Sequence, residues 1–337
     1  MTAPSAKNLT ADVARHLARR ARWRAWEYAF WAVAVGTIFL LPSKHLILTE
    51  IVILGLFALS LDLLIGYAGI LSLGHAAYFG FGAYVAGLLA KHGIIGEPLL
   101  ALLVAGLAAA VLGFATSFLV LRGSDLTRLM VTLGVSLVLR EVANRFDNLT
   151  GGADGLQGIL VGPLLGRFSF DMGGHVAYVY SLVVLFVLFY ISRRMVYSPY
   201  GLSLRAVKGN ALRASAIGID VNWRLISVYT VAASYAGIAG ALLTQSTQFC
   251  SLDVLSFDRS ADVLVMLILG GTGYLYGGLI GAILFKLAQD WIAGITPQYW
   301  QFWIGLVLVV IVLVGSERMR GWIGAIRRLG RAQRTGH

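Results

Sequence analysis

Long apolar runs separated by short polar stretches dominate the chain. A helix needs about 20 mostly apolar residues to cross the hydrocarbon core of a bilayer, and it satisfies its own backbone hydrogen bonds there. The pattern therefore predicts an all-α, polytopic membrane protein. The sequence contains ten apolar runs, at residues 28–41, 46–66, 70–90, 98–121, 126–144, 176–191, 225–245, 261–270, 277–293 and 302–315.

The number of crossings depends on two short runs, 261–270 and 277–293. If each run crosses the bilayer, the chain has ten crossings; if together they form one hairpin that enters and leaves from the same side, it has eight. Either even number places both termini on one face of the membrane. We expect about ten crossings and keep eight as the alternative.

Basic residues are concentrated in both terminal segments and between some of the runs. With the N-terminus inside, the cytoplasmic segments hold 20 of the 27 Lys and Arg residues. Cytoplasmic loops of membrane proteins carry such an excess, so both termini are expected to be cytoplasmic. The same rule accounts for the net charge of +11 without nucleic acid, for which the sequence has no recognition motif.

Composition leaves little room for a soluble domain. The chain is 58% hydrophobic and 13% charged, whereas an average soluble domain has about 25% charged residues. We expect one transmembrane domain at 27–316, preceded by a basic cytoplasmic arm at 1–26 and followed by a basic cytoplasmic tail at 317–337. The arm lacks the short apolar region of a cleavable signal peptide.

Sequence motifs for catalysis are absent. No G-x-x-x-x-G-K-[ST] loop could cradle a triphosphate, and neither H-E-x-x-H nor G-x-S-x-G occurs. The six histidines have no metal-ligand spacing, and the single Cys250 excludes an intrachain disulfide. We therefore expect no enzyme activity, no metal and no cofactor in this chain.

Glycines interrupt two of the apolar segments, 66–90 and 270–278. Each glycine in a helix costs roughly 1 kcal/mol relative to alanine, and interrupted hydrophobic segments indicate the substrate route of a transporter. We predict glycine-broken helices that line a substrate pathway. Its candidate residues are Gly66, Tyr67, Gly69, Ser72, Gly74, His75, Tyr78, Gly270, Gly271 and Gly273.

A structural role remains open for many of these positions. Small residues allow close helix packing, as in 80–87 and 237–241, and Ser72, His75 and the two tyrosines could be hydrogen-bonded packing residues. Among charges within the runs, Glu141 and Arg145 have the spacing of a helical ion pair. Asp62 and Arg140 have no neighbour of opposite charge in sequence, which makes each a functional candidate.

Two polar segments are long enough to have structure of their own. The outward segment 145–174 contains TGGADGLQGI, where Gly151, Gly152 and Asp154 indicate a tight turn. It is either a plain loop or a structured cap at which substrate or a delivering protein docks.

The inward segment 192–224 contains a predicted amphipathic helix at 202–217. Apolar residues recur there every three or four positions, Gly218 is a plausible stop, and Arg205, Lys208 and Arg213 form the polar side. The helix either lies at anionic lipid headgroups or docks onto a cytoplasmic partner. Its predicted apolar stripe consists of Leu204, Val207, Ala211, Ala214 and Ile217.

Four motifs in order resemble the membrane-spanning permease subunits of branched-chain amino acid ABC importers, over about residues 46–315. They are GYAGILSLGHAAYFGFGAY, TGGADGL, SPYGLSLRAVKGNALRASAIGIDV followed by YAGIAGALL, and LGGTGYLYGGLIGA. The resemblance implies a bacterial inner-membrane permease that pairs with a second, related permease. It also implies two cytoplasmic ATP-binding cassettes, which would hold ATP and Mg²⁺, and a periplasmic substrate-binding protein.

The resemblance also implies which residues couple to a cassette. Gly201, Arg205, Ala206, Asn210, Ala214 and Gly218 match the family's cytoplasmic loop, and Lys208 joins them on the polar side. The chain departs from the family where Gly209, Ala211 and Ser215 replace customary acidic residues, which concerns the choice of cassette.

The expected mechanism is alternating access driven by ATP hydrolysis in the cassettes. A largely apolar path suits small amino acids with aliphatic side chains, while urea, short amides and other small organic solutes remain alternatives. A stand-alone secondary carrier or channel is the alternative of another class. Reversing the charges of Arg205 and Lys208 should abolish uptake by an importer and barely affect a solitary carrier.

Overall fold

The computed structural model describes residues 23–171, 173–295, 302–303 and 305–306. Within these residues all secondary-structure elements are helical, and strand pairing is limited to two isolated bridges, Leu156 with Cys250 and Leu164 with Phe168. The predicted all-α fold is therefore confirmed for this part of the chain. The chain divides into two compact units, Met1–Leu284 and Phe285–His337. In the second, Lys286 lies 3.4 Å from Asp290 along the last helix.

Helices of 14 to 27 residues form most of the first unit. They are α2 (Ala25–Leu40), α3 (His45–Asp62), α4 (Ala76–Lys91), α5 (Pro98–Val120), α6 (Asp125–Arg145), α8 (His175–Val196), α11 (Val221–Thr247), α12 (Phe257–Gly270) and the first half of α13 (Leu275–Ile295). The short helical elements are η1 (Pro42–Lys44), η2 (Leu63–Ala68), α7 (Asp147–Thr150), η3 (Gly152–Asp154), α9 (Pro199–Gly209), α10 (Ala211–Ala216) and η4 (Leu252–Leu255).

Five stretches of the described chain are long and apolar enough to cross a membrane. They are Pro42–Ala68, Pro98–Val120, His175–Val196, Val221–Thr247 and Leu275–Ile295. The polytopic architecture is thus supported, whereas the total of about ten crossings and the side of the termini stay predictions. Most of the run 302–315, most of the basic arm and the whole basic tail lie outside the described residues.

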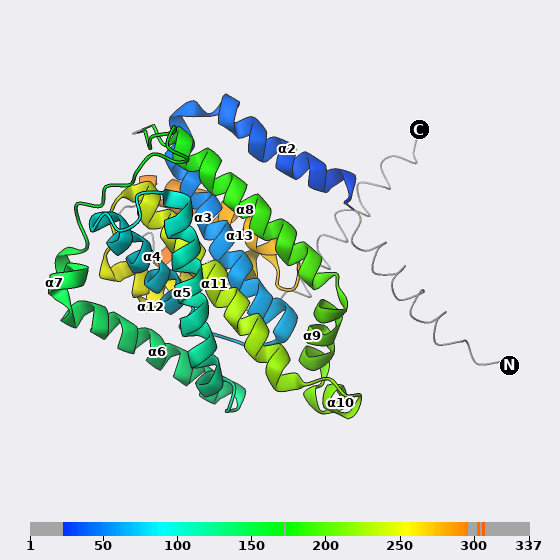
Figure 1. The fold of residues 1–337 in the computed structure, drawn as a ribbon. Coiled ribbons are helices and arrows are strands. Elements are labelled where there is room, and N and C mark those ends of the chain that lie inside the picture. Colours follow the sequence, from blue (N-terminus) through cyan, green and yellow to red (C-terminus); the bar gives the residue numbers. More distant parts are fainter. Residues whose placement is uncertain (1–22, 172, 296–301, 304, 307–337) are drawn as a thin grey trace, which may run out of the picture. The chain divides into compact units, whose positions relative to one another are not determined.

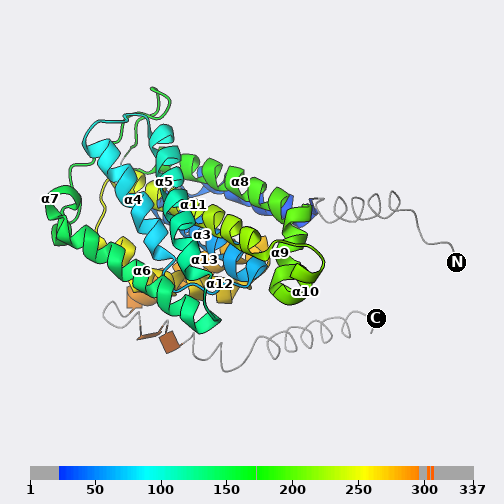
Figure 2. The same ribbon diagram turned by 60° about the horizontal axis from the view of Figure 1, so that its bottom comes forward.

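The core of the first unit surrounds α3 and α11. Figures 1 and 2 show these two helices through its middle, with α4 and α5 against α11 and with α8 against α3. α9 and α10 lie at one end, beside the end of α8 and the start of α11. We call this the α9 end. Because α11 begins just after α10, the end of α11 at Thr247 lies at the opposite end.

Small residues bring α4 and α11 into close backbone contact. A Cβ atom added at Gly82 would collide with the backbone of Gly237, and one added at Gly240 would collide with the carbonyl of Phe79. Close approach of this kind needs residues without bulky side chains. The predicted packing role of these glycines is confirmed.

Both predicted helix breaks are present. The last turn of α3 continues into the π-helix η2, which ends at Gly69 in the left-handed region (φ +74°). Residues 69–75 are irregular, so the run 70–90 is helical only from Ala76. Between α12 and α13, Gly271 (φ +92°) and Gly273 (φ +75°) adopt a backbone conformation that glycine enters at little cost.

α6 differs from the prediction in its charged residues. Among the residues the structure describes, no ion pair joins Glu141 to Arg145, and both side chains are exposed, as is Arg140. An exposed pair of this spacing is worth only about 0.3–0.5 kcal/mol, which is too little to hold two long side chains in one geometry.

Candidate transport and coupling site

Three segments far apart in the sequence meet at the α9 end. The backbone N–H of Gly273 donates to Oδ1 of Asp62 at 2.7 Å, and the Lys208 ammonium donates to the carbonyl of Gly66 at 2.7 Å. The Arg205 guanidinium lies 5.3 Å from the centre of the Tyr67 ring, within cation–π range. These contacts join the π-helix, the turn after α12 and helix α9. We call this set of six residues the junction.

Glycine is required where the two broken segments touch. A Cβ atom added at Gly66 would collide with the Asp62 carboxylate and with the backbone of Gly273. Any side chain at Gly66 would therefore push the turn between α12 and α13 away from η2. The two broken segments therefore touch backbone against backbone at the junction.

Asp62 is the buried charged group of the junction. Its side chain has no solvent exposure, and among the described residues its Oδ2 has no hydrogen-bond partner. Burying a carboxylate costs free energy unless donors or opposite charge compensate it. The Gly273 N–H supplies one donor from 211 residues away, a partner that sequence spacing could not reveal.

The predicted pathway residues fall into two groups. Six lie at the junction or its adjoining turns, namely Gly66, Tyr67, Gly69, Gly270, Gly271 and Gly273. There the side chain of Lys208 passes close to Gly69, where an added Cβ would lie 3.0 Å from its Cγ. The other four, Ser72, Gly74, His75 and Tyr78, lie among packed helices farther along the chain.

His75 and Tyr78 make hydrogen bonds between buried elements. The fully buried His75 places Nε2 2.8 Å from the Ser60 hydroxyl, and its ring stacks on Phe57. The Tyr78 hydroxyl lies 2.9 Å from that of Tyr229 on α11. This geometry is that of hydrogen-bonded packing residues, the alternative that the sequence left open. Ser72 is also buried, and Gly74 packs against the backbone of Thr132.

The prediction of one continuous helix at 202–217 is wrong. α9 ends at Gly209, Asn210 is extended (φ −163°), and α10 follows. The Asn210 side chain accepts the N–H of Arg213 at 2.9 Å, so it caps a second helix instead of continuing the first. Of the predicted apolar stripe, Leu204, Val207 and Ala214 are buried, whereas Ala211 and Ile217 are exposed.

The predicted coupling residues mainly shape this helix pair and hold it in place. Gly201 packs against the carbonyl of Val196, and Gly218 ends the segment with φ +86°. Arg205 and Lys208, which the sequence places on the polar side, contact Tyr67 and Gly66 of their own chain. Ala206 is half-buried and Ala214 is buried. The large apolar side chains that are most exposed on this segment are Leu212 and Ile217, 84% and 75% accessible.

At the opposite end, the described part of segment 145–174, which is all of it except residue 172, folds into a structured loop. Gly151 and Gly152 have positive φ and follow Thr150, whose hydroxyl donates to the carbonyl of Ala143. Asp154 is exposed at the end of the turn, which confirms the predicted tight turn. Beyond it, the buried Leu156 pairs with the backbone of Cys250.

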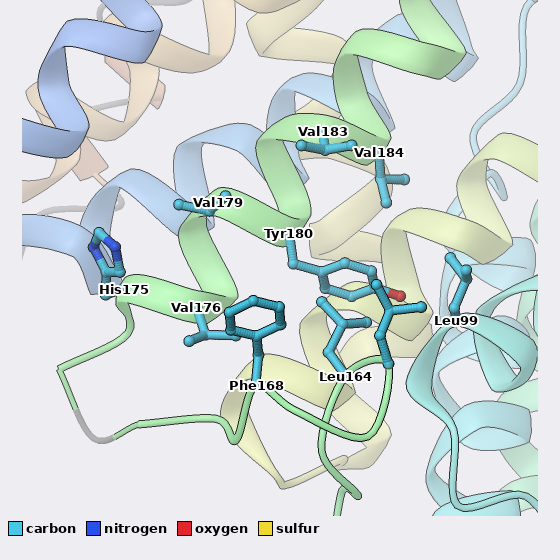
Figure 3. Close-up of a pocket in the computed structure, with 10 residues that line it drawn as sticks. Leu99, Leu164, Phe168, His175, Val176, Val179, Tyr180, Val183 and Val184 are labelled. Carbon is cyan, nitrogen blue, oxygen red and sulfur yellow. The ribbon is translucent and has the colours of Figure 1, made fainter.

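The same loop covers an apolar groove of about 410 Å³ on α8. Figure 3 shows Leu164 and Phe168 of the loop facing Val176 and Tyr180 of α8, with Leu99 of α5 at its side. Valine and leucine side chains form most of the wall. Such a wall offers a charged solute no compensation for lost water.

Sequence reasoning missed a buried ion pair between α2 and α8. Glu27 lies 3.0 Å from Arg193, and both side chains are less than a tenth exposed. The Arg193 guanidinium also lies over the rings of Trp23 and Tyr197. A single acidic residue at the start of an apolar helix, opposite a basic pair at the end of another, was the available signal.

Comparison with known proteins finds similar permease sequences. A family described as "Branched-chain amino acid transport system / permease component" matches residues 45–312. The high-affinity branched-chain amino acid transport system permease protein LivM of Escherichia coli (strain K12) is 26% identical over 279 residues, which cover 77% of this chain and 65% of LivM.

Other relatives are similar over most of their length. LivM of Salmonella typhimurium is 25% identical over 85% of this chain and 72% of its own. The fructose import permease protein FrcC of Rhizobium meliloti is 26% identical over 85% of this chain and 81% of its own. No solved structure matches the chain. The match to 45–312 covers well over half of the sequence, and the chain belongs to the branched-chain amino acid transport system permease family.

Proposed function

We propose that this chain is the membrane-spanning permease subunit of an ATP-driven importer for branched-chain or similarly small aliphatic amino acids. The junction is the observation that supports this most directly, because it ties a peripheral helix pair to two glycine-broken helices. In this proposal the α9 end faces the cytoplasm, the membrane is the bacterial inner membrane, and the opposite end receives the substrate.

The proposed mechanism transmits motion from outside the chain to the helix breaks. A cytoplasmic cassette that hydrolyses ATP with Mg²⁺ binds α10 and displaces α9. Lys208 and Arg205 then pull η2, and the Asp62 contact carries the displacement to the turn after α12. Two cassettes, a second related permease and a periplasmic binding protein complete the assembly. The transport path alternates its access between the two faces.

FrcC favours a sugar importer as the second candidate. A solitary carrier is the candidate of another class, and it needs no partner at α10, whereas an importer must bind an ATPase. Because Arg205 and Lys208 contact their own chain, reversing their charges would disturb a solitary carrier as well. Copurification with an ATPase and uptake of radiolabelled leucine test the proposal; leucine uptake that persists after ATP depletion would contradict it.

Leu212→Glu is expected to release the cassettes. Full burial of a leucine side chain contributes roughly 1.5–3 kcal/mol, and a carboxylate at this position would oppose docking. The expected result is loss of cassette copurification and loss of most leucine uptake, with an unchanged melting temperature of the chain. Ile94→Glu is the matched control, because Ile94 is 68% exposed at the opposite end; equal copurification of the two variants would refute α10 docking.

Lys208→Met is expected to uncouple ATP hydrolysis from transport. It removes a charged hydrogen bond to Gly66, of a class worth about 1.5–3 kcal/mol, and leaves the exposed face of α10 intact. Leucine uptake should fall about tenfold while the assembled importer keeps its ATPase activity. Arg194→Met removes an exposed charge at the end of α8 and should leave both unchanged. Parallel loss of uptake and ATPase in the Lys208 variant would instead indicate failed assembly.

A further inference from the structure

A second cavity lies at the end of the first unit opposite α9. It is bounded by the beginning of α3, the end of α11 and the segment 249–259, and its volume is about 650 Å³. Sites for small molecules commonly have volumes of roughly 300–1,000 Å³. None of the predicted pathway residues lines this cavity, so it is distinct from the junction.

The cavity has an apolar floor and a charged rim. Ile53 and Val254 form the floor and are at most 4% exposed, and the hydroxyl of the neighbouring Thr49 donates to the carbonyl of His45. Asp253 and Arg259 lie on the more exposed rim, where the guanidinium donates from Nε at 3.1 Å and from Nη2 at 2.9 Å to Oδ2 of Asp253. The half-buried Glu50 of α3 contributes a second carboxylate to the cavity.

This combination of groups selects for one chemical class of ligand. A carboxylate and a guanidinium in one cavity can bind an ammonium and a carboxylate of the same molecule, and charge-assisted hydrogen bonds are the stronger ones. The apolar floor accepts an aliphatic side chain. A sugar is uncharged, so it could form hydrogen bonds with these groups but no ion pair with the carboxylate or the guanidinium. The described residues that line the groove in Figure 3 include no carboxylate and no guanidinium, so that groove cannot make this distinction.

We propose that this cavity is the entry site for a zwitterionic amino acid with an aliphatic side chain. The ligand's ammonium lies toward Glu50, its carboxylate shares the Arg259 guanidinium with Asp253, and its side chain packs over Ile53 and Leu243. The inference rests on the proposed function and deepens it, because it favours amino acids over sugars. It assigns the discrimination to residues of this permease.

Protection of an introduced thiol tests the site in the assembled importer. Ser246 lines the cavity, and the native thiol of Cys250 is only 1% exposed, so Ser246→Cys can be labelled selectively by a charged maleimide added outside. At a leucine concentration of about four times its Kd, labelling should slow about fivefold. Leucinamide, which lacks the carboxylate, and fructose should give little protection at the same concentration.

Charge variants combined with Ser246→Cys identify the recognising groups. Glu50→Gln, and the pair Arg259→Gln with Asp253→Asn, should each require about tenfold more leucine for the same protection. The pair keeps two hydrogen-bonding side chains in place and avoids an unpaired carboxylate. Lys91 is an exposed charge at the end of α4 and outside the cavity. In Lys91→Gln, leucine should protect the introduced thiol as well as it does in the Ser246→Cys protein alone. Labelling rates without leucine report whether each variant keeps the cavity folded.

The outcomes separate this inference from the proposed function. Uptake of leucine by the unmodified importer, together with labelling that leucine does not slow, overturns the entry site and leaves the importer function standing. Protection that is equal in the charge variants and in Lys91→Gln overturns the assigned groups. Protection by fructose but not by leucine overturns the ligand class. Absence of ATP-dependent leucine uptake in the unmodified importer overturns the proposed function itself.

Discussion

Gly240→Leu is expected to prevent the chain from folding into a stable bundle. A Cβ atom at this position would collide with the carbonyl of Phe79 on α4, so the two helices would have to separate along their whole contact. Overpacking of a well-packed interior commonly costs about 1–3 kcal/mol, and a collision with backbone belongs at or above the upper end. The measurement is the fraction of detergent-solubilised protein that stays monodisperse on heating.

Gly134→Leu is the matched control, because it is also a glycine within a long helix. An added Cβ there meets nothing within 4 Å, and leucine is a better helix former than glycine. The isolated chain should therefore keep or slightly gain thermal stability. If the Gly240 variant melted at the same temperature as the Gly134 variant, close contact between α4 and α11 would be disproved.

The fold could be predicted where one segment carried its own signal. Apolar runs located α3, α5, α8 and α11 to within a few residues, since lipid and core both demand continuous apolar helices. Clustered glycines located the breaks at Gly69 and between α12 and α13 for the same local reason.

Prediction failed for two reasons. Some decisive contacts join residues far apart in the sequence, and at one position two local signals favoured different structures. The Asp62 contact with Gly273 spans 211 residues, and no local pattern specifies it. At Asn210 the apolar spacing favoured one helix, but a side chain that can cap a helix start favoured two. The amphipathic pattern and the family resemblance place Arg205 and Lys208 on a docking helix, but neither reveals their contacts with Tyr67 and Gly66 of η2 in the same chain.

Arg193→Met is expected to destabilise the chain by about 3–5 kcal/mol, since it would leave a buried Glu27 carboxylate without its cation. The pair is formed at 3.0 Å with both side chains largely buried, and it joins α2 to α8. Glu27→Met should cost a similar amount for the reciprocal reason. Thermal unfolding of the detergent-solubilised chain measures both variants, and the same preparation serves for the double variant.

The double variant Glu27→Met with Arg193→Met should be more stable than either single variant. Removing both charges removes the cost of burying an unpaired ion, and replacement of a buried pair by apolar side chains is often neutral or stabilising. The methionines would extend the aromatic surface that Trp31 and Phe189 already form between these helices, and flexible thioethers fill such irregular space. A double variant whose loss of stability equals the sum of the two single losses would show that Glu27 and Arg193 do not interact, and that α2 is held to α8 by its aromatic contacts alone.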